Sequence, residues 1–234
     1  MTGETAQEKN LTNALISALA LLPDIPTQEQ VEEKARSLAA LFGYSFGVKL
    51  LDVRRPSLST LMNEQRFSWV TQSSRRDNPM DAILSGNLMN AVSFFASTTA
   101  LLILALFTVI GQLPQFAPGL ASIGLGTQYE VIDFQIHNVS MLVLFVSAFL
   151  SFTLSLRQFN HFCILIGGMD HTRPASAEEI RTTARINAMA AQNFNAGIRA
   201  YYFAIPMVAW FVSSWGAVIV TIATIGFLIH REYF

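Results

Sequence analysis

Few residues of this chain have the type and spacing that chemistry needs. Asp133 and His137 are four residues apart, and Arg157, Asn160 and His161 share one face of the helical stretch that follows. Ionisable groups at the ends of membrane helices usually serve as anchors and caps, which is the interpretation we favour. Polar contact with another helix or a lipid headgroup, and ion or proton handling, are the alternatives.

Arg157, Asn160 and His161, together with Arg199, are the candidate contacts to a polar interface or to lipid headgroups. No residue is predicted to bind a metal, because the four histidines have no ligand spacing. The sequence also has no GxSxG, P-loop, HExxH, CxxC or paired-carboxylate motif, and Cys163 has no base fixed nearby. We therefore expect no cofactor and no enzymatic activity.

Small and hydroxyl side chains predict close helix packing at two places. Ser97 and Thr98 belong to a group of hydroxyl residues spaced about one helical turn apart, and Gly43 and Gly47 continue a ladder of small residues from Ala39. In a membrane such residues let helices approach closely, and hydroxyls bond within or between helices. A polar pore lining is the alternative for the hydroxyl group.

The composition of the chain indicates the environment in which these residues lie. Only 13% of the 234 residues are charged and 52% are apolar, and no charged residue occurs from Ala82 until Glu130. A soluble surface cannot be built from so few charges. The net charge of -1 and the single cysteine exclude a nucleic-acid binder that relies on positive charge and a disulfide scaffold. We predict an all-α integral membrane protein.

Three stretches have the roughly 20 apolar residues that cross a bilayer. These predicted spans are residues 88–110, 139–156 and 202–229. The third contains Pro206 and a Ser-Ser-Trp-Gly sequence, so that it is either one kinked helix or two shorter helices. The polar helical stretch 178–199, which precedes it, is expected to cover the cytoplasmic face of the bundle.

The chain divides into an amphipathic N-terminal region, residues 1–75, and a transmembrane helical domain, residues 76–234. Within the first region, residues 35–51 form a helical segment whose uncharged part is only twelve residues long. The segment is either a short first transmembrane helix or a surface helix, so the expected number of spans is three or four. Amphipathic cytoplasmic helices complete the predicted fold.

Arginine and lysine predict the orientation. They are absent between Asp77 and Leu156 and abundant on both sides of that stretch. By the positive-inside rule, the arginine-rich loops face the cytoplasm and the 111–133 loop faces the opposite side. We expect a multi-pass protein of the cell inner membrane.

Several phrases together resemble an uncharacterised family of membrane proteins, domain of unknown function 599. They are RRPSL (54–58), RFSW (66–69), RDN (76–78), FFAST (94–98), SLRQFNH (155–161) and RAYYFAIPMVAW (199–210). The resemblance covers about residues 38–234. It implies a multi-pass protein of about four spans, the first at residues 35–51, and implies no reaction, ligand or active site.

Without a catalytic motif, the sequence favours a protein that works by binding. We expect an accessory, assembly or scaffold subunit of a membrane complex, with membrane lipids and other membrane proteins or itself as partners and no nucleic acid. A small oligomeric channel or transporter that uses Ser97, Thr98 and the Arg157–His161 mouth is the alternative, and an enzyme acting on lipid is a weaker third hypothesis.

Overall fold

The computed structural model describes residues 58–76, 79–112, 119, 122, 131–210 and 214–233. Its helices are α3 (Leu58–Ser73), α4 (Pro79–Gly111), α6 (Val131–Gly167), α7 (Ala177–Trp210) and α8 (Ser214–Tyr233). Of the described residues 91% are helical and none lies in a strand, which confirms the all-α prediction.

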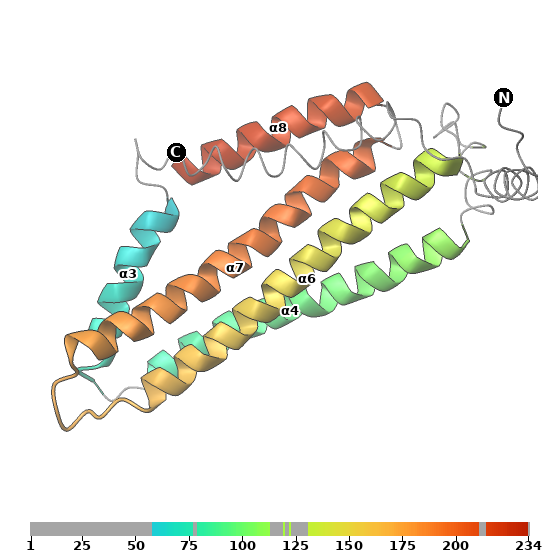
Figure 1. Ribbon diagram of the computed structural model, residues 1–234. Coiled ribbons are helices and arrows are strands. Elements are labelled where there is room, and N and C mark those ends of the chain that lie inside the picture. Colours follow the sequence, from blue (N-terminus) through green and yellow to red (C-terminus); the bar gives the residue numbers. More distant parts are fainter. Residues whose placement is uncertain are drawn as a thin grey trace, which may run out of the picture.

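The four long helices form an elongated bundle in which each runs antiparallel to the next (Figure 1). α6 packs against both α4 and α7, and α8 packs against α7. The short α3 lies along the first half of α7, below the end of α8. We call the end that holds α3 and the α6–α7 connection the arginine-rich end of the bundle.

Three helices are long and apolar enough to cross a membrane, over Met80–Gly111, Phe134–Gly167 and Trp215–Glu232. Their outer faces carry large apolar side chains, among them Leu101, Leu104 and Ile222, which the bundle leaves exposed. Such a continuous apolar surface is stable in lipid and unstable in water. The chain is therefore a helical membrane protein.

The segment 202–229 consists of two helices in the structure. α7 ends at Trp210, and α8 begins at Ser214 and runs back along α7 (Figure 1). Pro206 lies inside α7 as a buried residue and does not end the helix. The stretch 178–199 belongs to the same α7 and packs lengthwise against α6, so it does not form a separate covering helix.

Aromatic rings fill the centre of the bundle, where α4, α6 and α7 meet. Phe152 of α6 is fully buried and lies between Phe95 of α4 and both Phe194 and Tyr201 of α7, at centroid distances of 5.6 to 6.0 Å. Gly197 of α7 packs directly against the Phe152 ring. The missing side chain of this glycine therefore sets how closely α7 approaches α6.

Several predictions concern residues outside the described part of the chain. They are Gly43, Gly47, the segment 35–51 and most of the N-terminal region 1–75. The side chain of Asp133 is likewise outside it.

Candidate functional site

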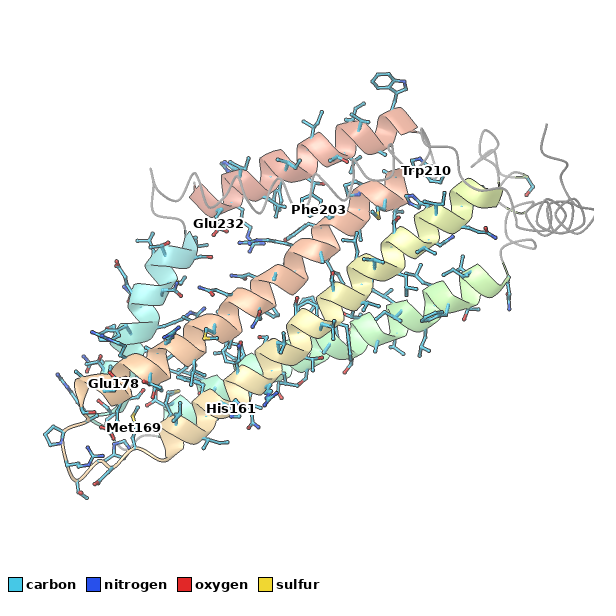
Figure 2. All side chains as sticks on the ribbon, viewed as in Figure 1. His161, Met169, Glu178, Phe203, Trp210 and Glu232 are labelled. Atoms are coloured by element: carbon cyan, nitrogen blue, oxygen red, sulfur yellow. The ribbon has the colours of Figure 1, made fainter. Side chains whose placement is uncertain are left out.

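Three of the four predicted polar contacts lie together, and the fourth lies apart. Arg157, Asn160 and His161 are exposed on α6, within the last eleven residues before the helix ends at Gly167 (Figure 2 labels His161). Arg199 is half-buried on α7. Because Gly197 packs on Phe152, the Arg199 backbone lies about 10 Å nearer the middle of α6 than Arg157, at about 1.5 Å per residue.

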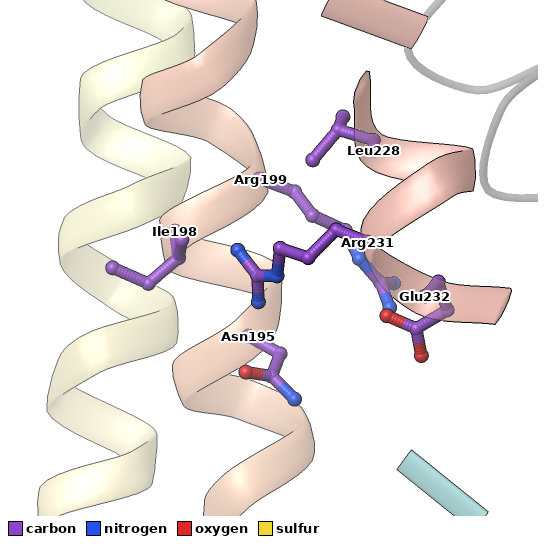
Figure 3. Close-up of a pocket in the computed structure, with 6 residues that line it drawn as sticks. All are labelled: Asn195, Ile198, Arg199, Leu228, Arg231 and Glu232. Atoms are coloured by element: carbon purple, nitrogen blue, oxygen red, sulfur yellow. The ribbon is translucent and has the colours of Figure 1, made fainter. Parts of the chain in front are cut away.

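Arg199 belongs to a polar cluster that joins α7 to the end of α8. Figure 3 shows Asn195, Arg199, Arg231 and Glu232 around a small cavity of about 10 Å³, enough for one water molecule. The Arg199 and Glu232 side chains point toward one another. Arg231 donates a hydrogen bond of 3.2 Å from Nη1 to the Tyr202 hydroxyl. The cluster thus brings charged side chains together between α7 and the end of α8.

Ser97 and Thr98, the residues predicted to pack between helices, lie beside Thr99, which contacts α7. Ser97 is exposed, and the Thr98 hydroxyl donates to the Phe94 carbonyl of its own helix at 2.8 Å. Thr99 is fully buried, and its hydroxyl lies 2.7 Å from the Tyr201 hydroxyl of α7. Thr99 is in the same turn of α4 as Ser97 and Thr98, and its hydroxyl contacts another helix of the described bundle.

His137, which the sequence placed at a helix mouth, caps a neighbouring helix. The ring is buried, stacks on Trp210 at 4.4 Å and donates from Nε2 to the Met207 carbonyl at 2.6 Å. Met207 is in the last turn of α7, whose carbonyls have no partner within the helix. The imidazole therefore closes the end of α7, which agrees with the capping interpretation.

A buried carboxylate joins α3 to α4. Asp81, only 3% exposed, accepts a 2.7 Å hydrogen bond from the Trp69 indole N–H and two from Arg76, at 3.0 Å from Nη2 and 3.3 Å from Nε. The Trp69 ring meets Phe162 of α6 edge-on at 5.3 Å. Asp81 also suits the positive end of the α4 dipole, but its main partners are on the preceding segment.

A second polar contact joins α3 to α7. Arg66 donates from Nη1 to the Asn187 amide oxygen at 2.9 Å, and Asn187 is fully buried. Burial lowers the pKa of Arg66, but a guanidinium stays charged at any physiological pH. Among the described residues, no carboxylate lies within ion-pairing distance of Arg66. The contact therefore holds a partly buried cation without a described counter-ion.

The connection from α6 to α7 ends in a capping box. The Ser176 hydroxyl accepts from the Glu179 N–H at 3.2 Å, and the Glu179 carboxylate accepts from the Ser176 N–H at 2.7 Å. Arg173 adds a 2.7 Å hydrogen bond from Nη2 to the same carboxylate. These bonds, led by that of Arg173, lower the pKa of Glu179 from 4.5 to about 2.

The low pKa of Glu179 makes this cap sensitive to acid only at low pH. Since the folded pKa lies below the unfolded one, the stabilisation is complete above pH 4.5 and is lost as the pH falls towards 2. A carbon-13 NMR titration of the Glu179 carboxyl should give a midpoint near 2, and R173Q should raise that midpoint toward 4.5. A wild-type midpoint near 4.5 would show that the cap does not form.

A groove of about 300 Å³ lies beside this cap at the arginine-rich end. The last turns of α6 form one wall and the first turns of α7 the other; Met169 and Glu178, on opposite walls, are labelled in Figure 2. Its lining residues are Ile164, Leu165, Gly168, Met169, Glu178, Glu179, Thr182 and Thr183. Within the described ranges, no group of three or more His, Cys, Asp or Glu side chains is arranged to hold a metal ion.

The long apolar helices and the polar junctions between them define a multi-pass helical membrane protein. Within that class, the chain belongs to the family described as protein of unknown function DUF599, which matches residues 35–234. No curated protein and no solved structure was found to match the chain.

Proposed function

We propose that this protein is an accessory, assembly or scaffold subunit of a membrane complex. The observation that carries the proposal is the exposure of large apolar side chains on two helices at the arginine-rich end. The exposed fraction is 51% for Met80, 57% for Ile83 and 43% for Leu84 on α4, and it is 63% for Ile164 on α6. All four lie near the ends of the two apolar helices, and large apolar side chains that project beyond the hydrocarbon layer commonly mark a protein contact.

The position of this surface along the bundle supports a contact with protein instead of lipid. Ile164 is seven residues beyond Arg157 on α6, or about 10 Å. The Met89 sulfur lies 3.5 Å from the Cys163 sulfur, so Ile83 and Leu84, which precede Met89 on α4, lie farther out still. If Arg157 marks the membrane boundary, these side chains project beyond the hydrocarbon layer.

The kind of partner follows from what adjoins the surface. Along α4, the exposed residues Ile83 and Leu84 continue into the exposed apolar residues Phe94 and Leu101. A partner helix that covers the whole row lies partly in the bilayer and partly beyond it. We therefore propose a membrane protein, or a second copy of this chain, as the partner, with the arginine-rich end in the cytoplasm and the bundle in the inner membrane.

Photo-crosslinking tests the proposal directly. A photoreactive residue replaces Ile83 or Ile164. A matched one replaces Leu104, which is 63% exposed in the second half of the α4 span. We expect the first two to form adducts with one and the same membrane protein, which also co-purifies stoichiometrically in mild detergent, and the third to form adducts with lipid. Equal lipid adducts at all three positions would contradict the proposal.

The alternative, an oligomeric channel or transporter, predicts a different result in the crosslinking experiment. Ser97 is exposed on the outer face of α4, so a path lined by it forms only between copies. Adducts exclusively between copies, combined with ion flux in liposomes that disappears on replacing Ser97 or Arg157, would support that alternative over the subunit role.

A further inference from the structure

The Arg66 guanidinium has an unused hydrogen-bonding edge. Nη1 is taken by Asn187, whereas Nε is buried and has no hydrogen-bond partner. Nη2 lies on the same edge as Nε, and it donates to no described residue. The Nε–Nη2 edge is the one that arginine uses to bind two oxygens of a carboxylate or phosphate in parallel.

Two more observations point to an acceptor at this junction. Asn187 is fully buried, and its amide nitrogen is a second donor without a partner. Its orientation is settled because the amide oxygen must face the Arg66 donor. Buried donors beside a buried cation are costly unless an oxygen, preferably a negatively charged one, reaches them. Asp81, the buried carboxylate at the start of α4, is engaged by Trp69 and Arg76.

The site lies at the level of the polar end of the α6 span. Asn187 is one turn before Ala190, whose carbonyl accepts from Ser155 of α6 at 2.7 Å. Because α6 and α7 are antiparallel, Asn187 is level with the residues just beyond Arg157. With Arg157 at the membrane boundary, the premise of the proposed function, this is the depth of the phosphate layer.

From these contacts we infer that Arg66, held in place by Asn187, binds an oxyanion of the phosphate type through its Nε–Nη2 edge at the α3–α7 junction. An anionic lipid headgroup and free phosphate share this chemistry. Nε is buried whereas the residue as a whole is only half-buried, so an oxyanion binds both donors once the side chains over Nε move aside. The bound oxyanion supplies the counter-ion of Arg66 and fastens α3 to α7.

The experiment separates the two sources of the oxyanion. The full-length protein is reconstituted in vesicles of phosphatidylcholine with a minor share of phosphatidylglycerol, extracted, and examined by native mass spectrometry for retained lipid. In parallel, the melting temperature in a zwitterionic detergent is measured with inorganic phosphate and with chloride at equal ionic strength. R66Q is compared with R75Q, which removes an exposed arginine nearby.

We expect the wild type and R75Q to retain about one phosphatidylglycerol per chain, or to gain thermal stability from phosphate, and R66Q to lose the effect about tenfold. R66K keeps the charge but lacks the two-donor edge, so it should lose the effect several-fold while staying folded. If neither ligand acts on the wild type, or if R66Q and R75Q behave alike, the inference is wrong and water solvates the edge.

Discussion

Replacing Gly197 with alanine is expected to destabilise the bundle by about 1–3 kcal/mol, a large effect for a single methyl group. An added Cβ would lie 2.5 Å from Cε1 and 2.6 Å from Cζ of Phe152, far inside van der Waals contact. The Phe152 ring cannot retreat, because it is fully buried and stacked on Phe95 at a centroid distance of 5.6 Å. α7 must therefore move away from α6.

Gly226→Ala is the matched control, since nothing lies within 4 Å of a Cβ built at Gly226 of α8. Alanine in an open helical position should leave stability unchanged or raise it by up to about 1 kcal/mol. Thermal unfolding in detergent, followed by circular dichroism, compares the two variants. Equal melting temperatures for G197A and G226A would show that α6 and α7 do not approach as closely as the structure has them.

Replacing Asp81 with leucine is expected to release α3 from the bundle at a cost of about 2 kcal/mol. The substitution leaves the Trp69 indole N–H without an acceptor and removes both acceptors of Arg76. Most of the loss comes from the part-buried Trp69–Asp81 bond, because Arg76 is 45% exposed and its ion pair is screened by water.

The readout is the accessibility of a cysteine placed at Val70, which is fully buried in α3. In a V70C background, D81L should make that thiol react many-fold faster with a water-soluble maleimide. D170N serves as the control, because Asp170 bonds to Thr172 and Arg173 of its own exposed loop. An unchanged rate in D81L would mean that apolar contacts alone hold α3.

The fold class and the apolar helices were predictable from the sequence. Long stretches without charge have only one stable environment, and their lengths match a bilayer. α7 was not recognised as one continuous helix of the bundle because its buried face is made of small residues. These small side chains carry little hydrophobicity, although they recur at the helical spacing that packing needs. They are Ala190, Ala191, Gly197, Ala200 and Ala204.

The polar junctions were less predictable, since each depends on how helices meet. Thr99 and Tyr201 are 102 residues apart, and Arg66 and Asn187 are 121 apart. Nothing local distinguishes Thr99 from Ser97 and Thr98, or Asn187 from the other asparagines of α7. Asp81 and Trp69 are only twelve residues apart, but their bond needs the angle between α3 and α4, which a sequence pattern does not specify.

The depth of the arginine-rich end in the bilayer tests the central claim, that this end offers a protein-binding surface outside the hydrocarbon. Spin labels at Ile83, Ile164 and Leu104 in lipid nanodiscs are compared by their relaxation with oxygen, which concentrates in lipid, and with a water-soluble nickel chelate. The account predicts that the Leu104 label responds to oxygen and that the Ile83 and Ile164 labels respond to the chelate. Labels at all three positions that respond mainly to oxygen would contradict it, because the exposed apolar side chains would then simply face lipid.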